Sequence, residues 1–295
     1  MAEDQSAAER VVRLGFPDID GLLALSGAVD WPHTREDWQT ILLSGLVFGV
    51  REAGEGTPVL ACAALFPYGP DACALGMVMV AGSQQRRGLG RLVVRRCLDA
   101  RPNADLPVYL ATTPQGEGLY RALDFRSIGH LAKMLADRAP AADDEALPEG
   151  WRLVPRIAMA DFVAVLRRDR RAFGAARDAF LKHRLGQAER RASLLDADGA
   201  LLGYGLGVRQ GDLLILGPVA AEDERAALAL IRGLAAGHDG PLRIDLTDPW
   251  SGLQAPLERL GFVLADRPPV MALGADGPPG DGWRGYPAIA AQAFL

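Results

Sequence analysis

The fold of this chain is decided by the sequence LGMVMV at residues 75–80 and by QRRGLG at residues 85–90. The first segment is an apolar run of strand length, and the second is a glycine-rich turn. Apolar residues then recur at spacings of three and four from Leu89 to Cys97, which predicts an amphipathic helix that ends before Pro102. A strand, a glycine-rich turn and a helix in this order form an anion cradle, because the turn and the new helix present unpaired backbone N–H groups.

A phosphate or pyrophosphate is the natural occupant of this cradle. Arg86 and Arg87 concentrate positive charge in the turn, where a purely structural connection would gain little from it. The alternative is a tight turn without a ligand, since a lone G-x-G is weak evidence of binding. The segment that follows the helix reads as a second strand, VYLATT at residues 108–113, and then as LYRALDF at residues 119–125.

This order of strand, Q-x-x-G-x-G turn, helix, strand and L-Y-x-x-L-x-F resembles the GNAT superfamily of CoA-dependent N-acyltransferases. The resemblance implies that the loop holds the CoA pyrophosphate through residues Gln85, Arg86, Arg87, Gly88, Leu89 and Gly90. It also implies that main-chain groups of Val78 and Val80 bind the pantetheine arm, and that Tyr120 protonates the leaving thiolate. A phenol suits this role because its O–H can be donated and its pKa lies near that of a thiol.

Three positions depart from the pattern of the family. Asp124 stands where the family usually has glycine, which predicts a different helix end. The turn at residues 112–116 has no asparagine, so a CoA contact there falls to Thr113 or to the backbone. The strand at residues 75–80 has no carboxylate, so the general base is unassigned.

The second half of the chain reads as a weak repeat of the first. The strand at 242–247 followed by LERLGF at 257–262 parallels 108–113 and 120–125, and residues 213–219 take the place of the first CoA strand. The spacing from Phe125 to Met134 equals that from Phe262 to Met271.

The repeat predicts an α/β (α+β) protein with two tandem GNAT-like domains, each a mixed, largely antiparallel twisted sheet flanked by helices. We expect a catalytic, CoA-binding domain at residues 1–138, a linker at 139–150 and a degenerate GNAT-like domain at 151–274. A Gly/Pro-rich C-terminal tail follows at 275–295, for which packing on the body and free movement are both open.

The second copy lacks the parts that carry the chemistry. Its turn reads AAEDER at residues 220–225, and carboxylates there would stabilise the helix end and repel a pyrophosphate. Leu257 replaces the tyrosine acid. We therefore expect the second domain to close the acceptor pocket and to bury apolar surface, without binding CoA in the same way.

Two further segments are candidates for the acceptor pocket. Trp31, Asp37 and Trp38 lie where the first helices of a GNAT fold cover that pocket, with the aromatic rings stacking on substrate and the acid pairing with its amine. The alternative is that the tryptophans anchor the helix to the sheet and that Asp37 is solvated. Asp169 and Arg170 are candidates in the second domain, with a surface ion-pair network as the alternative.

Composition narrows the class of protein. The net charge of −5 gives no general affinity for nucleic acid, and four dispersed histidines and three cysteines without C-x-x-C spacing predict neither a metal site nor a disulfide framework. No apolar run approaches membrane-spanning length, and the polar N-terminus has no signal region, so we expect a cytoplasmic protein without a membrane partner. A monomer, as an internal pseudo-dimer, and a homodimer are both open.

The expected function is transfer of acetyl from acetyl-CoA to a primary amine of a small molecule by direct attack, without a metal. A non-catalytic acyl-CoA-binding regulatory module and acetylation of a protein amine are the alternatives. A kinase or nucleotidase is disfavoured because G-x-x-x-x-G-K-[ST] is absent from the sequence.

Overall fold

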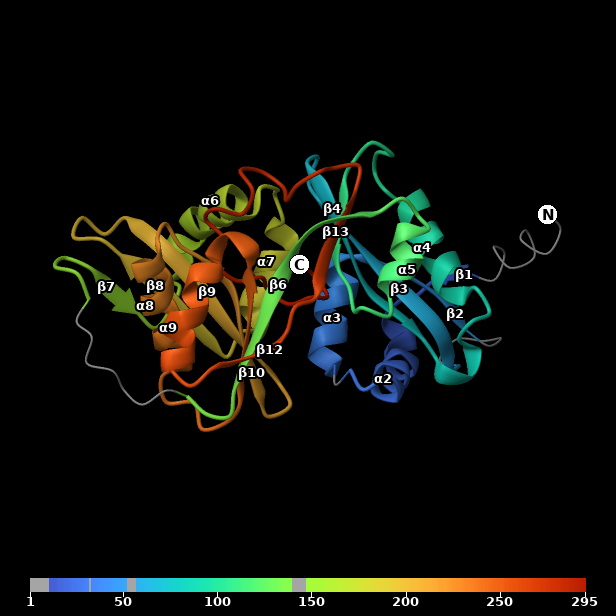
Figure 1. The fold of residues 1–295 in the computed structure, drawn as a ribbon, viewed down its shortest axis with the longest axis horizontal. Helices are drawn as coiled ribbons and strands as arrows, with labels where there is room; N and C mark the ends of the chain where they lie inside the picture. Colours follow the sequence, from blue (N-terminus) through green and yellow to red (C-terminus); the bar gives the residue numbers. More distant parts are fainter. Residues whose placement is uncertain (1–10, 32, 52–56, 140–146) are drawn as a thin grey trace.

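The computed structural model describes residues 11–31, 33–51, 57–139 and 147–295 (Figure 1). Most of the expected linker, residues 140–146, and the polar N-terminus lie outside the described residues. The expected boundaries of the two domains therefore stay a prediction. Below, the described residues before this linker are called the first half, and those from 147 to 274 are called the second half.

The first half carries the predicted strand, turn, helix and strand. β4, α4 and β5 match the motifs at residues 75–80, 85–99 and 108–113, and α5 carries Tyr120. The elements are β1 (Val11–Arg13), η1 (Phe16–Asp18), α2 (Ile19–Ala28), α3 (Arg35–Ser44), β2 (Leu46–Arg51), β3 (Val59–Tyr68), β4 (Ala72–Val80), η2 (Gly82–Gln84), α4 (Leu89–Asp99), β5 (Val108–Ala111), α5 (Glu117–Arg121) and β6 (Arg126–Ala136).

The second half repeats this order from β7 onward. β10, α8, β11 and α9 take the places of β4, α4, β5 and α5. The elements are β7 (Arg152–Val154), η3 (Met159–Asp161), α6 (Phe162–Phe173), α7 (Asp178–Gln187), β8 (Arg190–Leu195), β9 (Leu201–Gln210), β10 (Leu213–Ala220), α8 (Glu224–Ala235), β11 (Leu242–Thr247), η4 (Asp248–Leu253), α9 (Gln254–Arg259), β12 (Val263–Asp266) and β13 (Pro269–Leu273).

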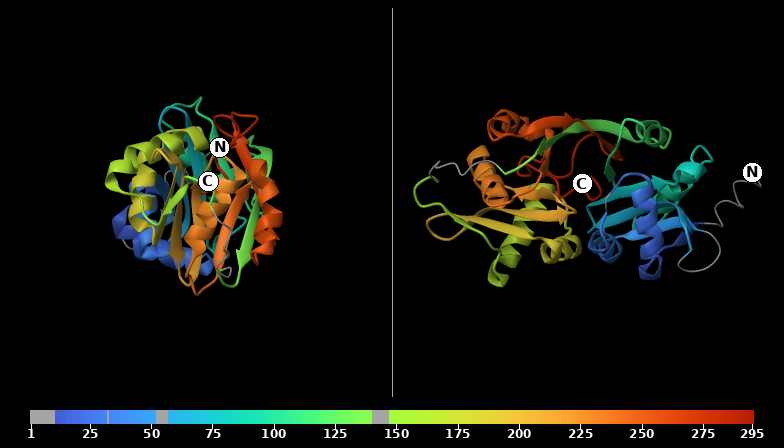
Figure 2. Two further views of the ribbon diagram at one scale, coloured as in Figure 1. Left: turned by 90° about the vertical axis from the view of Figure 1, so that its left-hand side faces the viewer. Right: turned by 90° about the horizontal axis from the view of Figure 1, so that it is seen from below.

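One continuous sheet runs through both halves because they exchange strands. Its order is β1-β2-β3-β4-β5-β13-β6-β11-β10-β9-β8-β7, with β12 paired to β6. The beginning of β6 pairs with β13, and its end pairs with β11 and β12. β13 in turn pairs with β5, so a strand from each half completes the sheet of the other (Figures 1 and 2). The fold is thus mixed α/β and mostly antiparallel, with helices on both faces.

Only two neighbouring strand pairs among the described residues run parallel, and both are short. β4 and β5 pair at Cys73–Val108 and Ala74–Tyr109. β10 and β11 pair at Leu214–Leu242 and Ile215–Arg243. Beyond these residues the pairing stops, so each half has a gap between its two central strands. We call these gaps the first cleft and the second cleft.

Three clusters of buried residues hold the molecule together. One lies between α4 and the sheet of the first half, and a second between α8 and the sheet of the second half. The third and largest lies where the halves meet and combines side chains of both, such as Trp38 and Tyr204. The second half therefore buries apolar surface against the first.

The tail (residues 275–295) packs back on the body, which decides between the two open alternatives. Trp283, Tyr286 and Phe294 are buried in the shared cluster. Figure 1 shows the end of the described chain between the two halves, and the right-hand view of Figure 2 agrees. The tail is thus part of the core, although its Gly and Pro content resembles that of a linker.

Candidate active site

The turn between β4 and α4 is shaped by two left-handed residues. Arg86 has φ 61°, and Gly88, the N-cap of α4, has φ 80°. No side chain caps this helix end. Gln85, Arg86, Arg87 and Gly88 are exposed. The chain thus turns sharply into the helix while its backbone stays accessible from solvent.

From Arg86 onward, the N–H groups of this turn have no partner among the described residues. None of the hydrogen bonds between described residues uses the N–H groups of residues 86–91, and the first helical bond runs from Leu92 N to Gly88 O at 3.1 Å. Unpaired N–H groups at the positive end of a helix attract an anion. The structure therefore brings the N–H groups of residues 86–91 together as one set of donors, whereas Gln85 N donates to Gly82 O at 3.4 Å.

The edge of β4 beside this turn is also free. Ala81 N donates to Leu60 O of β3 at 2.8 Å, and successive N–H groups of a strand point to opposite edges. The N–H groups of Val80 and Val78 therefore point into the first cleft, where β5 no longer pairs. Met77 has φ 53°, which marks the irregularity at which β4 turns its N–H groups toward this side.

Tyr120 lies on α5, below the surface. It is 6% exposed and packs edge-on against Phe125, with ring centroids 5.7 Å apart. None of the hydrogen bonds among the described residues involves its hydroxyl. Burial raises the pKa of this phenol, so it keeps its proton at neutral pH and can donate it.

Asp124 does not change the helix end, contrary to the expectation from the sequence. It adopts φ 64°, the left-handed conformation that Gly261 adopts with φ 91° at the matching position of the second half. Phe125 N bonds Tyr120 O at 3.1 Å, and the matching bond from Phe262 to Leu257 measures 3.0 Å. Aspartate tolerates this conformation better than most residues, so the turn survives the replacement of glycine.

Thr113 lies in the loop between β5 and α5. Its side chain is exposed, and its Oγ1 accepts from Gly116 N at 3.3 Å. Its hydroxyl hydrogen is left for another acceptor.

The three acceptor candidates of the first half differ in exposure. Trp31 is partly buried, with its ring 6.3 Å from that of His33. Trp38 is fully buried, and its Nε1 donates to Ser26 Oγ at 3.5 Å, as expected for a tryptophan that anchors a helix. Of the two tryptophans, Trp31 alone has surface to offer to a ligand.

Asp37 is buried rather than solvated, and it joins the two halves. It forms a capping box with Thr34 at the start of α3, and Gln187 Nε2 of α7 donates to it at 2.6 Å. Burial alone would raise the pKa of Asp37, but its interactions with His33 and Thr34 and the charge of Arg184 outweigh burial and hold it well below 3.8. The carboxylate stays charged at neutral pH.

Asp169 and Arg170 lie in different surroundings although they are neighbours on α6. Asp169 is buried and accepts two hydrogen bonds of 2.8 Å from Arg177, and a third from the Tyr204 hydroxyl. Burial lowers the pKa of Arg177, but the charge of Asp169 and the hydrogen bonds to it outweigh burial and raise that pKa well above its ordinary value. The expected alternative of a surface network is therefore wrong for this pair. Arg170 is exposed and pairs with Asp71 at 3.4 Å.

The matching turn of the second half carries carboxylates, and two N–H groups at its ends are bonded within the chain. Asp223 caps α8 by accepting from Ala226 N at 2.8 Å, and Ala221 N donates to Gly285 O of the tail at 3.1 Å. Glu222 pairs with Arg168 at 2.6 Å. This turn thus differs from the first by its carboxylates, which would repel a pyrophosphate, and by its contact with the tail.

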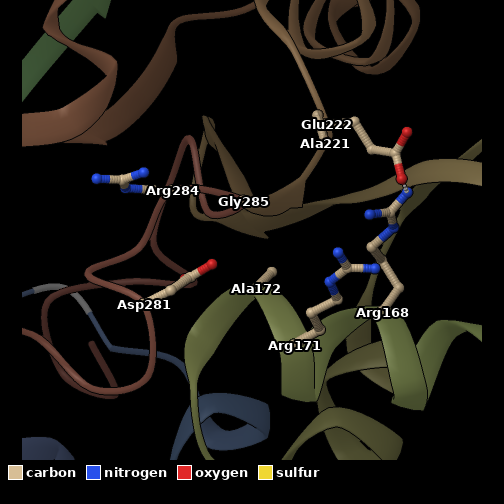
Figure 3. Close-up of a pocket in the computed structure, with 8 residues that line it drawn as sticks. All are labelled: Arg168, Arg171, Ala172, Ala221, Glu222, Asp281, Arg284 and Gly285. Carbon is tan, nitrogen blue, oxygen red and sulfur yellow. Dashed lines mark hydrogen bonds and ion pairs between the residues drawn. The ribbon is translucent and has the colours of Figure 1, made fainter.

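A pocket of about 340 Å³ lies beside this second turn (Figure 3). Its charged side chains are of both signs, and the tail forms one wall of it. The lining residues are Arg168, Arg171, Ala172, Ala221, Glu222, Asp281, Arg284 and Gly285.

Sequence reasoning missed the tail as part of the site. Ala293 O lies so close to Gly76 of β4 that a Cβ there would be 2.0 Å from it, and Tyr68 donates to Phe294 O at 2.9 Å. The available signal was the aromatic content of the last 13 residues, with Trp283, Tyr286 and Phe294, which is unusual for a free tail.

Two other observations concern the described part of the chain. No helix there is both long and apolar enough to cross a membrane. No group of three or more His, Cys, Asp or Glu side chains in these ranges is arranged to hold a metal ion.

Comparisons with known proteins agree with this geometry. The profile of the acetyltransferase (GNAT) family matches residues 24–125, and that of an acetyltransferase (GNAT) domain matches residues 165–286. The protein YitH of Bacillus subtilis, described as an uncharacterized N-acetyltransferase, is 28% identical over 264 residues, which are 89% of this chain and 91% of YitH.

Solved structures share the whole arrangement. A putative acetyltransferase from Pyrococcus horikoshii superimposes with a TM-score of 0.76 at 20% identity, covering 97% of this chain and 95% of the other. A tandem GNAT protein from the clavulanic acid biosynthesis pathway gives 0.67 at 19% identity, covering 89% and 97%.

The chain belongs to the GNAT superfamily. Within it, this is a protein of the tandem type, with one GNAT domain in each half.

Proposed function

We propose that this protein is an N-acetyltransferase that transfers acetyl from acetyl-CoA to a primary amine of a small molecule. The observation that supports it most is the free row of N–H groups at residues 86–91 beside the free edge of β4. The turn fits the pyrophosphate, and the edge of β4 at Val78 and Val80 fits the amides of the pantetheine arm. In the second half the tail covers the matching strand edge and carboxylates line the matching turn, so one site per chain is expected.

Each of several residues in the first cleft has its own role in the reaction. The N–H of Val78 polarises the thioester carbonyl, which makes it a better target for a neutral amine. Binding both reactants in one cleft orients them, so no covalent enzyme intermediate is needed. Tyr120 gives its proton to the thiolate that leaves. Trp31 is the candidate contact for the acceptor, and the general base stays unassigned.

Release of free thiol from acetyl-CoA tests this function directly. A panel of small primary amines, amino acids, amino sugars and a lysine peptide is incubated with the protein, and thiol is measured. We expect release above the amine-free rate with at least one small amine. A chain that binds acetyl-CoA and releases no thiol with any amine is the regulatory module instead, and release with the peptide alone indicates a protein acceptor.

Replacing Tyr120 with phenylalanine should lower kcat about 100-fold and leave the affinity for acetyl-CoA unchanged. The reason is that the change removes only the donated proton, which contributes on the order of 10²–10⁴ in rate. The same assay with Tyr109→Phe, at another buried tyrosine, is the matched control and should show wild-type turnover. Unchanged kcat in Tyr120→Phe would remove this residue from the mechanism.

The cellular setting is also a proposal. Cys62, Cys73 and Cys97 are free and buried, which fits a reducing compartment such as the cytoplasm. The shared cluster between the halves makes the chain an internal pseudo-dimer, which favours a monomer.

A further inference from the structure

The second cleft is open between its strands, yet the tail fills it. Residues 285–289 lie between the edges of β10 and β11 and pair with both, with Ala288 bridging to Val219 on one side and to Leu246 on the other. Three backbone hydrogen bonds of 3.0–3.1 Å hold them there: Val219 N to Ala288 O, Thr247 N to Pro287 O, and Ile289 N to Asp245 O. The N–H of Val219 corresponds in the repeat to the N–H of Val78.

The tail meets both halves at equivalent glycines. Gly217 of β10 and Gly76 of β4 occupy matching positions, each after a leucine. A Cβ at Gly217 would lie 1.9 Å from Ile289 O, and one at Gly76 would lie 2.0 Å from Ala293 O. Two tail carbonyls, four residues apart, therefore pass where any larger residue would block them.

Two arginine side chains of the second half hold the last residues. Arg184 Nη2 donates to Ala290 O at 3.0 Å, and Arg177 Nη1 donates to Leu295 O at 3.1 Å. Both arginines are 2% exposed. The backbone of the tail is thus satisfied by buried donors along its length, as in a bound peptide.

We propose that residues 285–289 are a permanent internal ligand of the second cleft, in the place that the pantetheine arm takes in the first cleft. Residues 290–295 pack against Gly76, beside the first site. The comparison with the first cleft rests on the proposed function. The ligand of this second site is an extended peptide with small residues at Gly285 and Ala288, supplied by the chain itself. Carboxylates at the second turn exclude CoA electrostatically, and the tail excludes it sterically.

Hydrogen exchange of the whole chain, with and without acetyl-CoA, tests the proposal. The N–H groups of Val219, Thr247 and Ile289 should exchange as slowly as core strand residues in both conditions. Those of Val78 and Val80 should exchange fast alone and slowly with acetyl-CoA. Fast exchange at the first three groups, or protection there only with acetyl-CoA, would overturn the internal ligand. No response at Val78 and Val80 would count against the proposed function alone.

A substitution that disturbs the contact between β10 and the tail tests the same proposal. Gly217→Ala places a methyl group against Ile289 O, so exchange at Val219 and Thr247 should rise at least about tenfold, with a smaller rise at residues 76–80. Gly186→Ala, on α7, is the matched control because its Cβ meets no atom within 4 Å, and it should exchange as wild type. If Gly217→Ala folds and its N–H groups exchange at the wild-type rate, the proposal is contradicted. If that variant does not fold, hydrogen exchange of the wild-type chain with and without acetyl-CoA still decides the question.

Discussion

Replacing Gly88 with glutamate is expected to raise the dissociation constant for acetyl-CoA at least about 100-fold. A Cβ at Gly88 meets no atom within 4 Å, so the longer side chain finds room beside the free N–H groups. Its carboxylate would then face the pyrophosphate. Two like charges about 4 Å apart near a surface repel by about 4 kcal/mol. Salt screens part of this repulsion, and the remainder corresponds to a loss of affinity of about 100-fold. Calorimetric titration measures the change.

Gly88→Gln separates charge from backbone strain. Gly88 has φ 80°, so any L-residue there is strained, and glutamine has the size of glutamate without its charge. We expect the glutamine variant to bind acetyl-CoA within about tenfold of wild type, since strain of this kind costs roughly 1 kcal/mol. Equal losses in both variants would mean that the turn acts through its shape and not by attracting an anion.

Replacing Asp169 with asparagine is expected to lower the free energy of unfolding by about 3–5 kcal/mol. The change leaves Arg177 charged, with its side chain 0% exposed and its main partner neutral. It also disturbs the hydrogen bond from Tyr204, in the cluster shared by the two halves. Urea denaturation followed by far-ultraviolet circular dichroism measures the loss.

The exposed ion pair between Arg170, on the same helix, and Asp71 is the control. Asp71→Asn removes the partner of Arg170, whose side chain is 60% exposed, and exposed pairs contribute about 1 kcal/mol or less. If both variants lost the same free energy of unfolding, the Asp169–Arg177 pair would contribute no more to stability than an exposed ion pair does.

Local features of this chain were predictable because they depend on neighbours in sequence. The strand, turn and helix at residues 75–99 followed from apolar spacing and glycine positions, and β4 and α4 confirm them. The second copy was predictable from LERLGF, whose Gly261 has the left-handed conformation that such a helix end needs. At Asp124 the prediction was wrong, because aspartate adopts that same conformation.

The exchange of strands could not be read from the sequence. Met134 and Met271 were recognised as equivalent from their spacing, yet each is buried in the core of the opposite half. The crossing occurs between His130, which pairs with β13, and Leu131, which pairs with β11. Such pairing joins residues more than a hundred positions apart, and no local propensity records it.

Burial of charged residues was equally hidden. Asp37 and Asp169 both stand on segments that look like polar helix surfaces, yet tertiary contacts bury both of them. Their partners Gln187 and Arg177 come from the second half and the α6–α7 turn. A single sequence shows which residues can pair but not which surfaces meet, so the candidate site was predictable at the turn and not at the acceptor side.

Calorimetric titration of the wild-type chain with acetyl-CoA tests the central claim, that the N–H groups of residues 86–91 form an anion site that the second half does not repeat. The account predicts one binding site per chain, with binding that weakens as salt is raised. Two equivalent sites, or one site that survives Gly88→Glu unchanged, would contradict it.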